Sequence, residues 1–372
     1  MKKKNLIVFG TRPEAIKMAP LVNRFLINDN FETKVCVTGQ HREMLDQVLD
    51  FFEIIPNYDL RLMKPNQNLY QLTGEVIAGL KPILESFKPD FVFVHGDTTT
   101  TMATCIAGFY SGAKICHIEA GLRTNNMLSP FPEEMNRQVA GRLASYHFAP
   151  TVKSQENLLR ENISIENTLI TGNTVIDALM ESSSRVEGLD NERIVELKKS
   201  IDFDKRILLV TGHRRENHGQ GFINICEALK EIATNNPSIE IVYPVHLNPN
   251  VLKPVNQLLS NIKNIHLVRP LPYPTFVWLM NKSYLIITDS GGVQEEAPSL
   301  GKPVLVMRDT TERPEAVEAG TVILVGTNKS KIVSVTQELL DDSDKYRSMS
   351  SLHNPYGDGK ACERIIEFML KL

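Results

Sequence analysis

The chain has 372 residues, of which 42% are hydrophobic and 23% charged, and its formal net charge is −3. This length exceeds what a single hydrophobic core usually serves, so we expect two domains. A charge so close to neutral offers no basic surface for nucleic acid or for an anionic membrane, and we expect neither as a partner.

The beginning of the chain and its cysteines indicate the cellular compartment. The lysines at 2–4 precede only a short apolar run, which is too short for a signal-peptide core or a membrane span. The five cysteines are odd in number, widely spaced, mostly set in apolar runs and form no C-x-x-C pair. Such cysteines are typical of buried, reduced thiols, and we expect a cytoplasmic protein.

Strand and helix patterns alternate along almost the whole chain. The expected strands are 6–9, 34–37, 91–94, 114–116, 207–210, 239–243, 285–287 and 304–307. Between them lie segments with helical spacing: Met18, Val22 and Phe25 follow an i, i+4, i+7 pattern, and a second such set ends at Phe87. Continuous apolar strands separated by helices predict an α/β fold with parallel sheets that are covered on both faces.

A polar stretch over residues 181–205 divides this alternation into two comparable halves. We therefore expect two Rossmann-like, doubly wound domains facing across a cleft, with residues 1–172 in the first and 173–355 in the second. The remaining segment, 356–372, contains a short amphipathic helix. In such folds ligands bind at the carboxyl ends of the strands.

Polar residues follow the first expected strand. Arg12 and Lys17 lie five residues apart across a turn and a Pro-initiated helix start, within reach of one anion; a solvated basic pair is the alternative. After the third strand, the four threonines at 98–101 suit a helix N-terminus, where hydroxyl groups cap free N–H groups.

Three carboxylates follow in successive loops. Asp97 comes after the third strand, Glu119 after the fourth, and Glu133 in a Pro-framed segment that leads into a helix. From these successive loops the three side chains can converge. Crowded carboxylates raise one another's pKa, which makes such a group competent for acid/base work near neutrality.

The same clusters allow a second interpretation. His95-x-Asp97 and His117-x-Glu119 resemble the ligand sets of a metal-dependent hydrolase. Each histidine also adjoins apolar strand residues, however, and a buried, hydrogen-bonded side chain is the simpler interpretation.

A glycine turn marks the second half of the chain. The apolar run 284–287 leads into Ser290, Gly291 and Gly292, and then into a segment with helical character. Strand, tight turn and helix start form a phosphate cradle, since glycine lets backbone N–H groups approach an oxyanion. Glu296, farther along that helix, suits hydrogen bonds from sugar hydroxyls. A plain connecting loop is the alternative.

Cationic and aromatic residues accompany the turn. His213 and Arg313 follow two further strands, and with Arg12 and Lys17 they suit a diphosphate. Phe276, in the aromatic stretch 273–278, is a candidate for stacking on a base, with core packing as the alternative.

Strings in order through residues 5–362 carry a family resemblance. TRPEAIKMAPL, VHGDTTTT, HIEAGLR, SPFPEE, TGNTVIDAL, HRREN, YPVHLNPN, TDSGGVQEEAPSLGKPVLV, RDTTERPE and NPYGDG are similar to the bacterial non-hydrolysing UDP-N-acetylglucosamine 2-epimerases. The resemblance implies a glycosyltransferase-B-like fold whose last helix, within 356–372, packs back on the first domain, and a homodimer.

The resemblance also implies the reaction. The family interconverts UDP-N-acetylglucosamine and UDP-N-acetylmannosamine for surface polysaccharides, by eliminating UDP to an enzyme-held 2-acetamidoglucal and adding it back with C2 inverted. We expect no metal and no redox cofactor, because the sugar keeps its oxidation level and the first strand lacks a GxGxxG fingerprint.

By position, the resemblance implies substrate contacts from Arg12, Lys17, Asp97, Glu119, His213, Leu271, Phe276, Ser290, Gly291, Gly292, Glu296 and Arg313. Catalysis is implied for Asp97, Glu119, Glu133 and His213. Leu271 stands where relatives carry Gln, so only its main chain is expected to bind the uracil.

A second substrate molecule activates some members of the family. The corresponding positions here are Gln40, Glu43, Asn66, Glu133, Arg214 and His246. Glu43 replaces a Gln and Asn66 an Arg, which adds a negative charge and removes a cation near a diphosphate. We therefore expect weaker activation.

Two other functions share parts of this pattern. A retaining UDP-sugar glycosyltransferase would have the same fold, glycine turn and ribose-binding Glu, and a nucleotide-sugar sensor would bind without reacting. Neither needs the three carboxylates of the first half.

Overall fold

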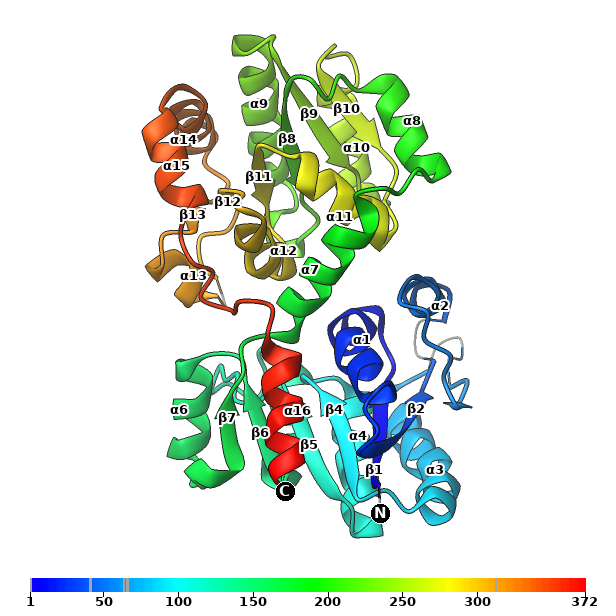
Figure 1. Cartoon of the computed structure of the whole chain (residues 1–372). Coiled ribbons are helices and arrows are strands. Elements are labelled where there is room, and N and C mark those ends of the chain that lie inside the picture. Colours follow the sequence, from blue (N-terminus) through cyan, green and yellow to red (C-terminus); the bar gives the residue numbers. More distant parts are fainter. Residues whose placement is uncertain (1, 40–41, 63, 65–66, 312) are drawn as a thin grey trace. The chain divides into compact units, whose positions relative to one another are not determined.

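The computed structural model describes residues 2–39, 42–62, 64, 67–311 and 313–372, with the backbone alone at 42 and 43. The chain divides into two compact units, Met1–Ala178 together with Gly357–Leu372, and Leu179–Tyr356 (Figure 1). Each unit has a parallel sheet, of seven strands in the first and six in the second. The predicted α/β class with two Rossmann-like sheets is confirmed.

The sheet of the first unit has the order β3-β2-β1-β4-β5-β6-β7, so the chain starts in its middle and winds outward both ways. Its strands are β1 (Lys3–Phe9), β2 (Phe31–Val37), β3 (Tyr58–Asp59), β4 (Phe91–His95), β5 (Lys114–Ile118), β6 (Tyr146–Ala149) and β7 (Thr168–Ile170). Its helices are α1 (Arg12–Leu26), α2 (Arg42–Phe51), α3 (Leu69–Phe87), α4 (Thr99–Ser111), α5 (Glu133–Leu143), α6 (Val152–Arg160) and the short η1 (Ile165–Asn167). Helix α7 (Thr174–Val186) begins in this unit and ends in the other.

The sheet of the second unit has the order β10-β9-β8-β11-β12-β13. Its strands are β8 (Arg206–Thr211), β9 (Ile239–Pro244), β10 (Ile265–Val268), β11 (Leu285–Thr288), β12 (Val304–Val306) and β13 (Val322–Leu324). Its helices are α8 (Glu192–Ser200), η2 (Arg215–Asn217), α9 (Gln220–Asn235), α10 (Pro249–Leu259), α11 (Tyr273–Lys282), α12 (Gly291–Glu296), η3 (Ala297–Leu300), α13 (Pro314–Glu318), α14 (Lys329–Asp341) and α15 (Ser343–Ser350).

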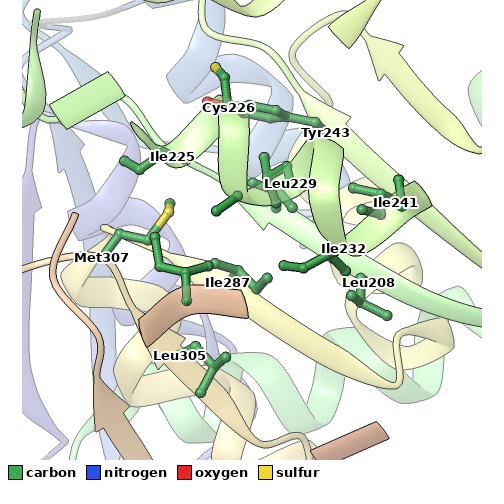
Figure 2. Close-up of a cluster of buried hydrophobic side chains, with 14 of the residues drawn as sticks. Leu208, Ile225, Cys226, Leu229, Ile232, Ile241, Tyr243, Ile287, Leu305 and Met307 are labelled. Carbon is green, nitrogen blue, oxygen red and sulfur yellow. The ribbon is translucent and has the colours of Figure 1, made fainter. Parts of the chain in front are cut away.

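The core of the second unit shows why its sequence forms these layers. Ile225, Leu229 and Ile232 recur at helical spacing on α9 and are fully or almost fully buried. They pack on side chains of the sheet such as Leu208 and Ile287 (Figure 2). The continuous apolar strands are thus covered by an amphipathic helix, as burial of a parallel sheet requires.

The last helix, α16 (Ala361–Lys371), belongs to the first unit. Its first turn is capped by Asp177, which accepts hydrogen bonds from the N–H groups of residues 361 and 362 at 3.0 and 2.9 Å. Ile365 and Met369 are fully buried, and the ring of Phe368 packs edge-on against that of Phe148 on β6. Figure 1 shows this helix in red beside the strands.

Two further properties bear on the sequence predictions. The five cysteines are free and buried, as predicted. Within the described part of the chain, no helix has both the length and the apolar character needed to cross a bilayer.

Candidate functional site

The loops after β1, β4 and β5 lie side by side, because these three strands are neighbours in the first sheet. The loop after β1 leads directly into α1, whose N-cap is Thr11 and whose start contains Pro13. The predicted Pro-initiated helix start is confirmed, and so is the capping role in the threonine tetrad, where Thr98 accepts a hydrogen bond from the N–H of Thr101.

Glu14 joins two of these loops from inside the protein. Its carboxylate accepts hydrogen bonds from the N–H groups of Gly10 and Thr11 at 3.0 and 2.8 Å, and from the hydroxyl of Thr98 at 2.6 Å. Burial raises the pKa of Glu14, and these hydrogen bonds oppose that rise. The side chain therefore ties the start of α1 to the loop that carries Asp97.

Glu119 is the centre of the first cluster of polar side chains. It has φ of 59°, an uncommon left-handed conformation for a residue with a side chain. Its carboxylate pairs with Lys17 of α1 and accepts a hydrogen bond from Asn173 at 2.8 Å. The Nε2 atom of His95 lies 3.8 Å from the same oxygen. Side chains from α1, from the end of β4 and from the loop after β7 thus meet at this carboxylate.

Asp97 lies beside Glu119 and has a cationic partner of its own. Arg137 of α5 pairs with its carboxylate, and Asn136 donates to its carbonyl at 2.9 Å. Burial raises the pKa of Asp97; the Arg137 guanidinium lowers it, and the charge of Glu119 raises it further. Asp97 and Glu119 are therefore close enough to interact, as their positions after neighbouring strands predict.

Glu133, the third predicted carboxylate, is the first residue of α5 and is half-buried. It precedes Arg137 by four residues, so the two side chains share one face of the helix. Among the described residues nothing forms a hydrogen bond or ion pair with Glu133. Its neighbour Glu134 is buried, and its carboxylate accepts hydrogen bonds from the N–H groups of Thr124 and Asn125.

The two histidines of the alternative metal interpretation are buried. Burial lowers the pKa of His95 to about 4 and that of His117 to about 3, so both rings are neutral near pH 7. The Nε2 atom of His117 lies 2.7 Å from the carbonyl oxygen of Gly96. Across the part of the chain that the structure describes, no group of three or more His, Cys, Asp or Glu side chains is placed to hold a metal ion.

In the second unit, the loops after β8 and β11 meet at Asp289. This fully buried carboxylate accepts hydrogen bonds from the N–H groups of His213 and Arg214, both at 2.9 Å, and from the side chain of Asn217 at 3.2 Å. The His213 ring stacks on His246, with centroids 5.4 Å apart. His213, predicted from the cationic run after β8, is thus held at the carboxyl end of the sheet.

The glycine turn lies among cationic groups of the same unit. A Cβ atom added to Gly291 would lie 3.9 Å from Nη2 of Arg214 and 4.0 Å from Nη2 of Arg313. The Arg313 guanidinium pairs with the buried Glu295 of α12. Two guanidinium groups therefore converge on the backbone that was predicted to cradle phosphate.

The neighbouring side chains differ in exposure. Glu296 ends α12 and is largely buried, with Oε2 4.0 Å from where a Cβ of Gly292 would stand. Phe276 on α11 and Leu271 just before that helix are half-buried. Phe276 is outside the buried core, unlike its neighbour Val277.

The remaining predicted positions are those of the second substrate site. Gln40 and Asn66 lie outside the described residues, and so does the side chain of Glu43. Arg214 and His246 are described, and both lie beside His213.

Arg12, predicted to contact the substrate, is the first residue of α1 and is half-buried.

Sequence reasoning missed several residues that hold the predicted ones in place. Arg137, Asn173, Asp289 and Glu14 were not predicted as partners of any site residue. Asp289 directly follows β11 and Asn173 lies in the short loop after β7, which is a signal that the sequence contains; Arg137 lies within a helix and carries no such signal.

The two Rossmann-like units, with carboxylates at the strand ends of one and cationic groups at the strand ends of the other, define an α/β enzyme of the glycosyltransferase-B-like class. The family model described as UDP-N-acetylglucosamine 2-epimerase matches residues 25–370. The chain therefore belongs to the UDP-N-acetylglucosamine 2-epimerase family, whose members are isomerases.

The similarity to individual proteins extends over almost the whole chain. The UDP-N-acetylglucosamine 2-epimerases of Escherichia coli K12 and Campylobacter jejuni are 60% and 59% identical to the chain; the alignments cover 98% and 100% of it, and 97% and 98% of those proteins. A crystal structure of the Neisseria meningitidis enzyme bound to UDP-GlcNAc is 51% identical, with a TM-score of 0.89 over 99% of this chain and 100% of that one.

Proposed function

We propose that the chain interconverts UDP-N-acetylglucosamine and UDP-N-acetylmannosamine by elimination and re-addition of UDP. In the first step a carboxylate takes the proton from C2, the C1–C2 double bond forms, and the C1–O electron pair leaves with UDP. The 2-acetamidoglucal then receives a proton at C2 on the opposite face, and the β-phosphate oxygen of UDP attacks C1. Atoms and charge balance without any oxidant.

The observation that carries this proposal is the pair of neighbouring carboxylates, Asp97 and Glu119, each held by a cation. Proton removal from one sugar face and delivery to the other needs two acid/base groups. Burial raises the pKa of Asp97 above its ordinary value, and the Arg137 guanidinium opposes that rise. Lys17 and Asn173 fix the orientation of Glu119. Glu133, the first residue of α5 and four residues before Arg137, is proposed as a third acid/base group.

Departure of UDP needs positive charge and donors at the β-phosphate. In the second unit Arg313 and Arg214 supply such charge around the turn Ser290–Gly292, and His213, next to Arg214 in the chain, is proposed to supply a ring N–H donor. Arg12 and Lys17 are proposed to contact the substrate from the first unit. Because the developing negative charge appears on the leaving oxygen, these groups stabilise the transition state more than the bound substrate.

The nucleoside contacts follow from the second unit as well. We propose that Glu296 accepts hydrogen bonds from ribose hydroxyls, that Phe276 stacks on the uracil and that the main chain of Leu271 binds its edge. The half-buried state of the Phe276 ring supports this assignment over a core role.

Three further features belong to the proposal. The product is proposed to feed synthesis of a surface polysaccharide. A homodimer is proposed, supported by Phe109 and Tyr110 at the end of α4, which are 58% and 77% exposed. A second UDP-N-acetylglucosamine is proposed to bind near Gln40, Glu43, Asn66, Glu133, Arg214 and His246.

Chemical quenching during turnover tests the mechanism. We expect free UDP and 2-acetamidoglucal in quenched mixtures of enzyme and UDP-N-acetylglucosamine. Asp97→Asn, Glu119→Gln and Glu133→Gln should each lower turnover by about 10²–10⁴ with the fold intact. Near-normal turnover of all three variants would refute the carboxylate mechanism.

A further inference from the structure

Asp289 holds the turn that carries His213 and Arg214. It follows β11, whose neighbour in the sheet is β8, and its Oδ2 atom accepts the two consecutive N–H groups of this turn at 2.9 Å. Asn217 adds a third hydrogen bond to Oδ2 at 3.2 Å and also donates to the carbonyl of Met307 at 3.0 Å. One buried oxygen thus fixes the backbone of both cationic residues.

The second oxygen of Asp289 is used differently. Oδ1 lies 3.6 Å from Nδ1 of His213, which is an ion-pair distance and longer than a hydrogen bond. Among the described residues it has no hydrogen-bond partner, although the side chain is fully buried. A buried oxygen without a partner costs stability, and an asparagine would bind the same three donors with its single oxygen. The negative charge therefore serves the contact with His213.

The surroundings of His213 act on its charge in opposite directions. Their net effect lowers the pKa of His213: burial lowers it most, the Asp289 carboxylate opposes this, and His246 and Arg214 lower it further. Asp289 is thus the group among them that favours the charged ring. The His213 side chain remains 44% exposed, so it is accessible to a ligand.

We infer that Asp289 is a positioning residue that favours the protonated form of His213 and directs its ring at the leaving diphosphate. The inference rests on the proposed function for the identity of that ligand. When the C1–O bond breaks, its electron pair passes to the β-phosphate oxygen, and the imidazolium donates a hydrogen bond to that oxygen. When UDP adds back, the oxygen becomes bonded to C1 and His213 keeps its proton. Asp289 itself touches neither substrate nor the reacting atoms.

Asp289→Asn provides the test, because it removes the charge and leaves an oxygen for the three donors. Activity that needs the protonated ring falls as pH rises through the pKa of His213. In the variant this fall should begin at lower pH, and turnover near pH 8 should drop about tenfold or more. Asp289→Glu, which keeps the charge, should retain the position of the fall even where turnover is lower.

Asn217→Ala is the matched structural control. It removes one donor from Oδ2 but leaves the carboxylate opposite His213. We expect lower turnover with the fall in activity at the same pH as in the unchanged protein. If this control shifts the fall as far as Asp289→Asn does, the turn geometry and not the charge explains the effect, and the inference is wrong.

A second readout does not depend on turnover. The His213 ring, assigned by its absence in His213→Gln, is titrated by NMR in the ligand-free protein and in Asp289→Asn; Asp289→Ser replaces the latter if it does not fold. A titration shifted to lower pH supports the inference, and an unshifted titration overturns it. Absence of epimerase activity in the unchanged protein would refute the proposed function instead, and the NMR comparison would still decide the role of Asp289.

Discussion

Lys17 and Glu119 are 102 residues apart in sequence and form an ion pair in the first unit. Both side chains are nearly buried, with exposed fractions of 13% and 9%. Lys17 comes from α1, which follows β1, and Glu119 from the turn after β5, so the pair connects segments that follow two strands separated by β4 in the sheet. In a nearly buried pair, the loss of one partner leaves the other charge uncompensated. We therefore expect an added charge that displaces or neutralises either partner to disturb the site.

Asn173→Asp tests that expectation. The amide of Asn173 donates to Glu119 at 2.8 Å, and an aspartate of the same shape places a second carboxylate there. Repulsion should displace or protonate one of the two groups and lower turnover by about tenfold or more, since 1.4 kcal/mol corresponds to a factor of ten. Asn167→Asp, an exposed position, is the control and should leave turnover unchanged. Equal turnover of both variants would show that Asn173 does not orient Glu119.

Arg137→Gln should change the pH dependence of the reaction. Burial raises the pKa of Asp97, and the Arg137 guanidinium opposes this, so its removal raises that pKa further. Activity that needs ionised Asp97 is present above this pKa and is lost as pH falls through it. We therefore expect the acid side of the kcat profile to move to higher pH. Arg142→Gln, on the exposed face of α5, should leave the profile in place; an unmoved profile in both would contradict the Asp97 assignment.

Gly121→Ala should destabilise the first unit. This glycine follows the Glu119 turn with φ of 92°, and an added Cβ would lie 2.1 Å from the carbonyl oxygen of Ser154. The strained backbone and the clash should cost more than about 2 kcal/mol in urea unfolding. Gly74→Ala within α3, where nothing lies within 4 Å, should stabilise by roughly 0.5–1 kcal/mol. The opposite order would show that the turn has another conformation.

Glu43→Gln combined with Asn66→Arg should strengthen activation by substrate. The change removes a negative charge and adds a cation where a second diphosphate is proposed to bind, and charge-assisted contacts contribute about 1.5–3 kcal/mol each. We expect the unchanged protein to convert UDP-N-acetylmannosamine with little dependence on added UDP-N-acetylglucosamine, and the double variant to depend on it more. Strict dependence of the unchanged protein at micromolar concentration would refute this expectation.

The sequence predicted the parts of the fold with strong local patterns. All eight expected strands are present, because buried parallel strands are continuous apolar runs. The five strands that it missed are β3, β6, β7, β10 and β13, which are short or interrupted by polar residues such as His147 and His266. Their pairing depends on the neighbouring strands more than on their own composition.

For the candidate site, the sequence predicted which side chains follow strands but not their partners. Asp97 and Glu119 come together because β4 and β5 are neighbours in the sheet. The contact between Arg137 and Asp97 depends on how α5 packs. The hydrogen bond from the His213 N–H to Asp289 depends on the pairing of β11 with β8. Such contacts join residues 40 and 76 positions apart and have no local pattern.

Deuterium incorporation tests the central claim most directly. The protein is incubated in D2O with UDP-N-acetylglucosamine alone, and C2 of both sugars is followed by NMR. Elimination and re-addition predict that UDP-N-acetylmannosamine appears with deuterium at C2 and that deuterium enters the recovered substrate as well, without any acceptor. Formation of the epimer with C2 fully protonated, or reaction only when a sugar acceptor is added, would contradict the account.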